Sequence, residues 1–209
     1  MTLLDYIRTH GDQIAALAWQ HLLLFTVSLL GATAIGVALG IAVARTRIVA
    51  SIMVPAINLL QACPEVVLLA ISIPFLGIGF EGALVPLFVK GVLPILRNTT
   101  SGLAGVDART VEAATGIGLT PRQVLFRIEL PSALPVIISG VRVAAIMLIS
   151  VLTLTAYIGV DSLGTLIVQG IARMDPDPLL VGSILTAALA VAANYLLLGA
   201  ERAAANRLT

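Results

Sequence analysis

The sequence predicts an all-α integral membrane protein with five membrane-spanning helices. Of its 209 residues, 59% are hydrophobic and only 11% are charged, whereas about a quarter of the residues in soluble domains are charged. Runs long enough to cross a bilayer, which takes about 20 mostly apolar residues, lie at 21–44, 51–76, 82–101, 134–158 and 178–200. We expect these spans and their loops to form one transmembrane domain over residues 1–209.

The arginines are distributed unevenly between the ends of these spans, and this predicts the orientation. If the N-terminus lies outside the cell, the outer face holds only Arg8 and Arg173. The inner face then receives Arg45, Arg47, Arg97, Arg109, Arg122, Arg127, Arg202 and Arg207. Because cytoplasmic loops are enriched in Lys and Arg, we expect an external N-terminus, a cytoplasmic C-terminus and a cytoplasmic loop at 107–133.

Small residues and prolines recur inside the spans. Gly31, Gly36 and Gly40 follow one another through the first span, and small residues let membrane helices approach closely. We expect kinks at the prolines in the second and third spans, because a proline leaves a backbone carbonyl group of the preceding turn without its hydrogen bond, and that group needs another partner. The prolines are Pro55, Pro64, Pro74, Pro86 and Pro94. A bundle that encloses a pathway therefore fits this pattern better than a simple anchor.

The last external loop, after the fourth span, has hydrophobic residues at helical spacing. These are Leu163, Leu166, Ile167 and Ile171, which recur at the three- and four-residue intervals of an amphipathic helix. We interpret the segment as a short helix that lies across the outer mouth, with a plain connecting loop as the alternative.

The cytoplasmic loop at 107–133 begins with the signals of a short helix. Asp107 can cap a helix that begins at Ala108, because its carboxylate can accept hydrogen bonds from free N–H groups of the first turn. Gly116 or Gly118 can end this helix, because glycine readily adopts the left-handed backbone that often follows a helix. A first short helix is therefore expected between these signals.

A second helix is predicted directly after the first. Thr120 and Gln123 have the spacing of a capping box, and Pro121 occupies the first helical position. Pro131 is expected to end this second helix after Leu130. Two short helices joined by a glycine turn form a compact knob, whose mixed charged and apolar surface suits docking into a groove on a protein partner.

The same loop carries a recognisable signature. Its residues match every defined position of the EAA loop, at the same spacing: Glu112, Ala113, Ala114, Gly118, Ile128, Leu130 and Pro131. The chain therefore resembles the membrane permease subunits of bacterial ABC importers. Three segments, LLQACPEVVLLAISIPFLGIG, LPILRNTTSGLAGVD and TLTAYIGVDSLGTLIVQGI, are similar to the osmoprotectant group, which imports glycine betaine, choline, carnitine or related quaternary ammonium compounds.

This resemblance implies a type I, methionine-permease-like fold and a set of partners. The EAA loop would be the coupling helix that fits a cleft in a cytoplasmic ABC ATPase subunit, with Glu112, Ala113, Ala114 and Gly118 in that role. Other implied partners are a second copy of this permease or a homologous permease, and a periplasmic or lipoprotein substrate-binding protein. The implied location is the bacterial cytoplasmic (inner) membrane.

The chain lacks the features of an enzyme. A P-loop needs Gly-Lys followed by Ser or Thr, but the only lysine, Lys90, precedes Gly91 and Val92. We expect no metal site, because His10 and His21 have no Cys neighbours. No cofactor is expected in this chain, and ATP and Mg would be used by the partner ATPase. The net charge of +1, without a basic cluster, argues against a nucleic-acid partner.

Ionisable residues inside the spans leave one alternative open. Glu65 and Lys90 fall near the middle of adjacent antiparallel spans, and such residues mark pathways in ion-coupled transporters and channels. We interpret them as a structural or gate-lining ion pair, with a coupling-ion site as the alternative. Arg142 is expected to extend toward the inner interface, or alternatively to hold the EAA loop.

The aromatic residues bear on the cargo. Tight recognition of a quaternary ammonium group calls for an aromatic cage, yet the chain has only nine aromatic residues. Phe75, Phe88 and Tyr157 are candidates near a pathway, while Trp19 and Tyr195 fit interfacial anchors. We therefore expect selectivity to reside mainly in an external binding protein. An amino acid such as methionine is the alternative cargo.

Overall fold

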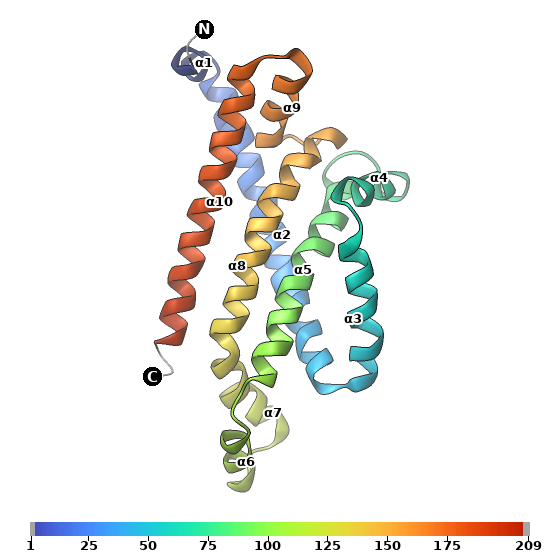
Figure 1. Ribbon diagram of the computed structural model, residues 1–209, viewed down its shortest axis with the longest axis vertical. Helices are drawn as coiled ribbons and strands as arrows, with labels where there is room; N and C mark the ends of the chain where they lie inside the picture. Colours follow the sequence, from blue (N-terminus) through green and yellow to red (C-terminus); the bar gives the residue numbers. More distant parts are fainter. Residues whose placement is uncertain (1–2, 207–209) are drawn as a thin grey trace.

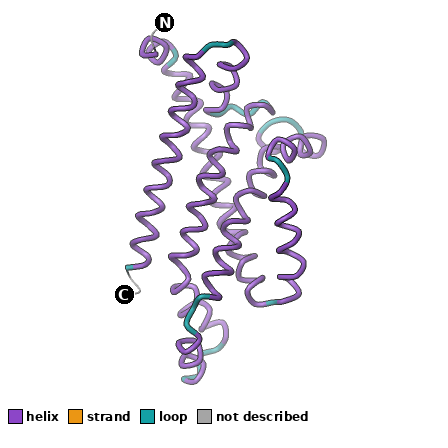
Figure 2. Tube along the Cα trace, in the orientation of Figure 1, coloured by secondary structure: helices purple, strands orange, loops and turns teal. Residues whose placement is uncertain are grey.

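The computed structural model describes residues 3–206, apart from the side chain of Arg47. The predicted inner-face residue Arg207 lies outside the described residues. Every regular element in this range is helical, which confirms the all-α prediction, and the helices are joined by short loops (Figure 2). The elements are α1 (Leu3–Thr9), α2 (Gly11–Arg45), α3 (Arg47–Ala62), α4 (Glu65–Leu76), α5 (Phe80–Ala104), α6 (Ala108–Gly116), α7 (Pro121–Val124), η1 (Leu125–Glu129), α8 (Leu130–Leu154), η2 (Thr155–Ile158), α9 (Leu163–Arg173) and α10 (Pro176–Ala205).

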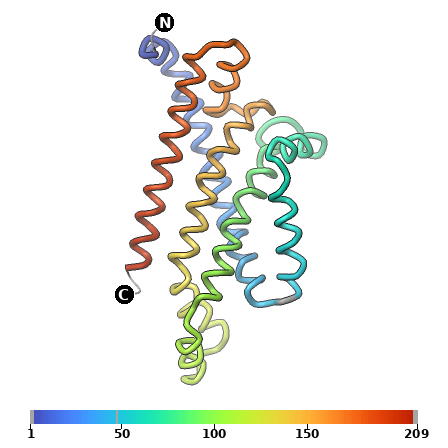
Figure 3. Tube along the Cα trace, viewed as in Figure 1, coloured from blue at the N-terminus to red at the C-terminus, as the bar shows by residue number. Residues whose placement is uncertain are grey.

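The long helices α2, α5, α8 and α10 run side by side and form the body of the molecule (Figure 1). Helix α5 packs on both α2 and α8, and α10 packs on the other side of α8. Leu87, Leu148 and Leu152 are completely buried where α5 and α8 meet. Figure 3 shows α1 beside the start of α10 at one end of the bundle, while α10 itself ends at the opposite end of the bundle. Helix α5 is therefore enclosed on several sides by protein.

The glycines of the first span allow α2 to approach α5 closely, as the small-residue pattern predicted. A Cβ atom added at Gly36 would lie 2.8 Å from the Cβ atom of Ile95, and one added at Gly40 would lie 2.6 Å from that of Thr99. Real Cβ atoms do not approach side chains of another helix so closely. These positions therefore exclude any larger residue unless the two helices separate.

Replacing Gly36 by leucine should lower the thermal stability of the detergent-solubilised protein. Overpacking a close helix contact costs about 1–3 kcal/mol, which corresponds to a fall of roughly 5 °C in Tm. Gly199→Leu is the matched control, because a Cβ atom at Gly199 meets nothing within 4 Å. Equal melting temperatures for the two variants would contradict the close α2–α5 contact.

Three helical segments are long and apolar enough to cross a membrane: α2, the helix that runs from Pro121 to Ile158, and α10. The number becomes four if α3 and α4 count together as one broken span. Helix α5, which contains the predicted span 82–101, is not among them, and it carries the charged residues Glu81, Lys90 and Arg97. Since α5 is packed among α2, α3, α4 and α8, it can carry these residues away from lipid. The count of five spans stays a prediction.

The expected second span, 51–76, is not one helix. It breaks at Cys63 and Pro64 into α3 and α4, whose axes differ by 102°. Proline lacks an N–H group and disfavours helical backbone in the residue before it, and the backbone of Cys63 is extended, with ψ at 131°. In Figure 1, α4 lies at the upper end of α3 and runs across the direction of the long helices rather than along it.

The prediction that Pro131 ends the second loop helix is wrong. Helix α7 continues through the π-helical segment η1 into α8, so the loop and the fourth span form one continuous helix. The N–H group of Leu130 donates to the carbonyl of Leu125, five residues earlier. This wider turn lies directly before Pro131, where a normal turn would bring the proline ring against a carbonyl group. The helix predicted in the last external loop is present as α9.

Candidate coupling loop and transport cavity

The loop at 107–133 forms a knob at one end of the bundle, with α6 and α7 side by side (Figure 1). The predicted caps are confirmed. The Asp107 carboxylate accepts a hydrogen bond from the N–H of Arg109 at 3.0 Å. The N–H of Thr120 donates to the side-chain oxygen of Gln123 at 2.8 Å, and the N–H of Gln123 donates to the Thr120 hydroxyl at 3.4 Å. Both helices of the knob therefore start at defined residues.

Gly118 makes the turn between the two helices. Its φ is +89°, in the left-handed region. The N–H of Gly118 donates to the carbonyl of Thr115 at 2.9 Å, and the N–H of Leu119 donates to that of Ala114 at 3.1 Å. This is the hydrogen-bond pattern of a Schellman motif, which satisfies the free carbonyl groups at the end of a helix. Gly118, rather than Gly116, is therefore the residue on which the turn depends.

The three residues of the EAA signature lie in different environments on α6. The side chains of Glu112 and Ala113 are exposed, while Ala114 is 6% exposed and packs inside the knob. Glu112 forms no ion pair with any residue in the described range 3–206. The exposed part of the signature thus offers a carboxylate next to a small side chain, and the buried part holds the knob together.

An ion pair connects the knob to the first span. The guanidinium group of Arg45, the last residue of α2, pairs with the carboxylate of Glu129 in the π-helical segment η1. Glu129 is only 8% exposed. The alternative prediction, that Arg142 holds the loop, is wrong. Its guanidinium instead meets the carboxylate of Glu201 at 3.1 Å and the side-chain oxygen of Asn194 at 3.4 Å, both on α10.

Glu65 and Lys90 meet at the break between α3 and α4. The Lys90 Nζ lies 3.1 Å from the Glu65 Oε1. It also donates to the carbonyl groups of Gln61 at 3.0 Å and Cys63 at 2.9 Å, at the end of α3. The C-terminal end of a helix is electronegative and its N-terminal end is electropositive. The positive charge of Lys90 therefore lies at the favourable end of α3, and the negative charge of Glu65 lies at the favourable start of α4. The pair therefore connects α5 to the break between α3 and α4.

A cavity of about 710 Å³ lies between α3, α5 and α8, next to this pair. Val143 and Met147 of α8 form part of its apolar wall. Its polar lining consists of Asn58, Gln61, Glu65, Lys90, Arg97 and Asn98. The guanidinium of Arg97 donates to the side-chain oxygen of Asn58, which joins α5 to α3. The cavity therefore carries charges of both signs.

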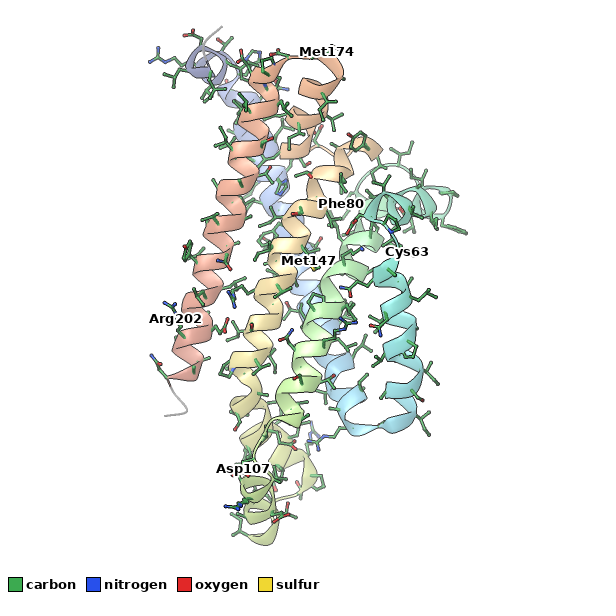
Figure 4. The ribbon with its side chains drawn as sticks, in the orientation of Figure 1. Cys63, Phe80, Asp107, Met147, Met174 and Arg202 are labelled. Atoms are coloured by element: carbon green, nitrogen blue, oxygen red, sulfur yellow. The ribbon has the colours of Figure 1, made fainter. Side chains whose placement is uncertain are left out.

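A second cavity of about 330 Å³ lies on the other side of the pair. Glu65, Lys90 and Met147 line both cavities, and Ser150 and Leu154 line only the second. Because residues 150–154 lie farther along α8, toward α9, the second cavity extends away from the knob. The ion pair therefore lies at the boundary between two cavities along one side of α8. Met147, which lines both cavities, is labelled on α8 in Figure 4.

The aromatic candidates lie elsewhere. Tyr157 is 61% exposed on η2 and lines neither of these two cavities. Phe75 is also exposed, on α4. Phe88 packs against Gly31 at the α2–α5 contact. Trp19 and Tyr195 are exposed on the outside of α2 and α10, which suits contact with the membrane.

Of the polar residues that line the larger cavity, sequence analysis singled out Glu65 and Lys90 but not Asn58, Gln61, Arg97 and Asn98 as pathway residues, although a signal exists. Asn58, Gln61 and Glu65 recur at intervals of three and four residues, and so do Lys90, Pro94 and Arg97. These intervals place Asn58 and Gln61 on one face of α3, with Glu65 just beyond the break at the start of α4, and they place Lys90, Pro94 and Arg97 on one face of α5. Polar residues on one face of an apolar helix indicate a face that does not meet lipid.

Comparison with known proteins agrees with this arrangement. Residues 33–207 match the family described as binding-protein-dependent transport system inner membrane component. The carnitine transport permease protein OpuCB of Listeria monocytogenes is 34% identical over 195 residues, which cover 93% of this chain and 89% of that protein. The choline transport system permease protein OpuBB of Bacillus subtilis is 34% identical over 200 residues, with coverage of 96% and 92%.

The fold is also similar to that of a solved transporter. An inward-facing form of the MetNI methionine ABC transporter matches with a TM-score of 0.80 and 24% identity, over 89% of this chain and 93% of that one. The predicted methionine-permease-like fold is thus confirmed, and so is the predicted resemblance to the osmoprotectant permeases. The chain belongs to the family of inner membrane components of binding-protein-dependent transport systems, as a permease subunit of an ABC importer.

Proposed function

We propose that this chain forms the translocation pathway of an ATP-driven importer for osmoprotectants such as glycine betaine, choline or carnitine. Relatives that are about one-third identical over almost the whole chain are named for carnitine and choline, which supports this cargo class. The complete complex would contain cytoplasmic ATPase subunits, a second identical or homologous permease and an external substrate-binding protein. ATP and Mg would bind to the ATPase subunits.

The observation that carries the proposal is the knob at 107–133. It combines an exposed carboxylate at Glu112, a small neighbour at Ala113 and rigid caps at both of its helices. The knob is also continuous with α8 and paired with α2 through Arg45 and Glu129. A movement of the knob caused by a bound ATPase would therefore be transmitted directly to α8 and α2.

The orientation in the membrane follows from charge. We place the knob and the C-terminal end of α10 in the cytoplasm, and α1 and α9 outside, with an external N-terminus. Figure 4 shows Asp107 and Arg202 in the half of the molecule opposite to Met174. The knob contains Arg109, Arg122 and Arg127, so the positive-inside rule favours this assignment.

The two cavities support alternating access. With the knob in the cytoplasm, the larger cavity lies toward the cytoplasm and the smaller one toward the outside. The Lys90–Glu65 pair lies between them, so we assign it to the gate. ATP binding would draw the ATPases together, shift the knob with α8, and change which cavity is accessible to cargo.

Purification of the tagged permease from its native membrane tests this function. We expect an ATPase subunit to co-purify, and we expect its ATPase activity in liposomes to rise when a cargo-loaded binding protein is added. Glycine betaine, choline and methionine serve as the cargoes compared. Stimulation by methionine alone would contradict the osmoprotectant assignment. Uptake that follows an imposed proton or sodium gradient without ATP would contradict the importer itself.

A further inference from the structure

We infer that the larger cavity binds a zwitterionic cargo in one defined orientation, an inference that rests on the proposed function. The carboxylate of the cargo contacts Arg97, and its quaternary ammonium group contacts Glu65. The permease thereby distinguishes cargoes that carry a carboxylate, such as glycine betaine or carnitine, from choline, which carries none. In this arrangement, part of the cargo selectivity resides in the permease itself and not only in the external binding protein.

The spacing of the charged groups suits a small zwitterion. Lys90 and Arg97 line the same cavity and are seven residues apart on α5, which corresponds to roughly 10 Å along a helix axis. Glu65 lies next to Lys90, with the two charged groups 3.1 Å apart. A carboxylate within about 3 Å of Arg97 leaves room for an ammonium group to approach Glu65 within about 4–6 Å.

The number of free hydrogen-bond donors determines whether Lys90 or Arg97 binds the carboxylate of the cargo. An ammonium group has three donors, and Lys90 already faces three acceptors: the carbonyls of Gln61 and Cys63 and the carboxylate of Glu65. Lys90 is also only 5% exposed. A guanidinium has five donors, and the exposed Arg97 makes a hydrogen bond with Asn58. Arg97 can therefore bind a carboxylate bidentately, whereas Lys90 cannot.

The other end of the cargo meets a carboxylate rather than an aromatic cage. Among the residues 3–206 that the structure describes, no aromatic side chain lines the larger cavity. The Glu65 side chain is 40% exposed and lines both cavities, so it can approach a cation while remaining beside Lys90. Because Lys90 already balances part of its charge, Glu65 attracts a cation only weakly. Weak binding suits a transport site, since the cargo must leave as well as enter.

Cargo binding to the purified permease–ATPase complex tests this inference. Isothermal titration without binding protein, using glycine betaine and choline as probes, measures the cavity by itself. Arg97→Gln should weaken glycine betaine binding about tenfold, the loss expected for a charge-assisted bidentate contact, and leave choline binding unchanged. Glu65→Gln should weaken the binding of both cargoes. Arg202→Gln, which removes an exposed charge outside the two cavities, is the matched control and should change neither.

The outcomes separate this inference from the proposed function. Equal effects of Arg97→Gln on the two cargoes, or no effect on either, would overturn the directional site. Absence of cargo binding to the unaltered complex would overturn it too. In all of these cases the proposed function still stands if the ATPase co-purifies and responds to a cargo-loaded binding protein. An unchanged melting temperature of the Arg97→Gln complex shows that a selective loss does not come from misfolding.

Discussion

Replacing Gly118 by valine, or Glu112 by lysine, should separate ATP hydrolysis from uptake. In liposomes that contain the whole complex and a binding protein, we expect uptake to fall at least tenfold for either variant. The amount of permease inserted in the membrane should stay unchanged. The measurement is the ratio of cargo transported to ATP hydrolysed, because a loss of coupling lowers this ratio even where the ATPase remains active.

The two substitutions act on different properties of the knob. At Gly118 the backbone has a φ of +89°, and a side chain with a branched Cβ costs about 2 kcal/mol there, which corresponds to a roughly 30-fold shift in the folding equilibrium of the turn. At Glu112 the exposed side chain changes charge while α6 keeps its caps. We therefore expect the first variant to misplace the proposed docking surface, and the second to repel a partner group that would bind the Glu112 carboxylate.

Gly116→Val is the matched control for Gly118→Val. A Cβ atom at either glycine meets nothing within 4 Å, but only Gly118 has a positive φ. Valine at Gly116 should therefore leave the turn intact and retain most of the uptake. Normal coupling in both Gly118→Val and Glu112→Lys would contradict the assignment of this loop as the surface that receives the ATPase.

Local chemistry explains why much of the knob could be predicted. The cap at Asp107 and the capping box at Thr120 and Gln123 depend on residues within three positions of each other, so their sequence spacing determines their geometry. Pro131 was misread because the same reasoning treats a proline as a helix end. The widened turn in η1 removes the clash, and it depends on how α8 and the knob are held together. Sequence spacing alone does not reveal that.

Contacts between distant residues explain what sequence analysis missed. Arg45 and Glu129 are 84 positions apart, and no local pattern indicates that the end of α2 reaches the knob. The pairing of Arg142 with Glu201 likewise depends on the packing of α10 against α8. The polar faces of α3 and α5 are readable from their spacing, but the 102° break that brings Lys90 to the end of α3 follows from tertiary structure.

Replacing Lys90 by methionine should abolish most transport and lower the stability of the permease. The buried ammonium group satisfies two carbonyls at the broken end of α3 and the carboxylate of Glu65. Breaking a buried ion pair costs about 3–5 kcal/mol. We expect a smaller loss here, about 2 kcal/mol, because the Glu65 side chain is partly exposed and water can screen it. Uptake per inserted molecule and Tm in detergent are the two measurements.

A double-mutant cycle with Glu65→Gln separates the two roles of the pair. If the two charges stabilise each other, the double variant Lys90→Met/Glu65→Gln loses less stability than the sum of the single losses, by about 0.5–3 kcal/mol. Additive losses would mean that Lys90 acts only through the carbonyls of Gln61 and Cys63. The double variant should still transport poorly, because a gate needs the polar contact that holds α3 and α4 against α5. Recovery of uptake together with stability would show instead that the pair is structural, and that the boundary between the two cavities is controlled by other residues.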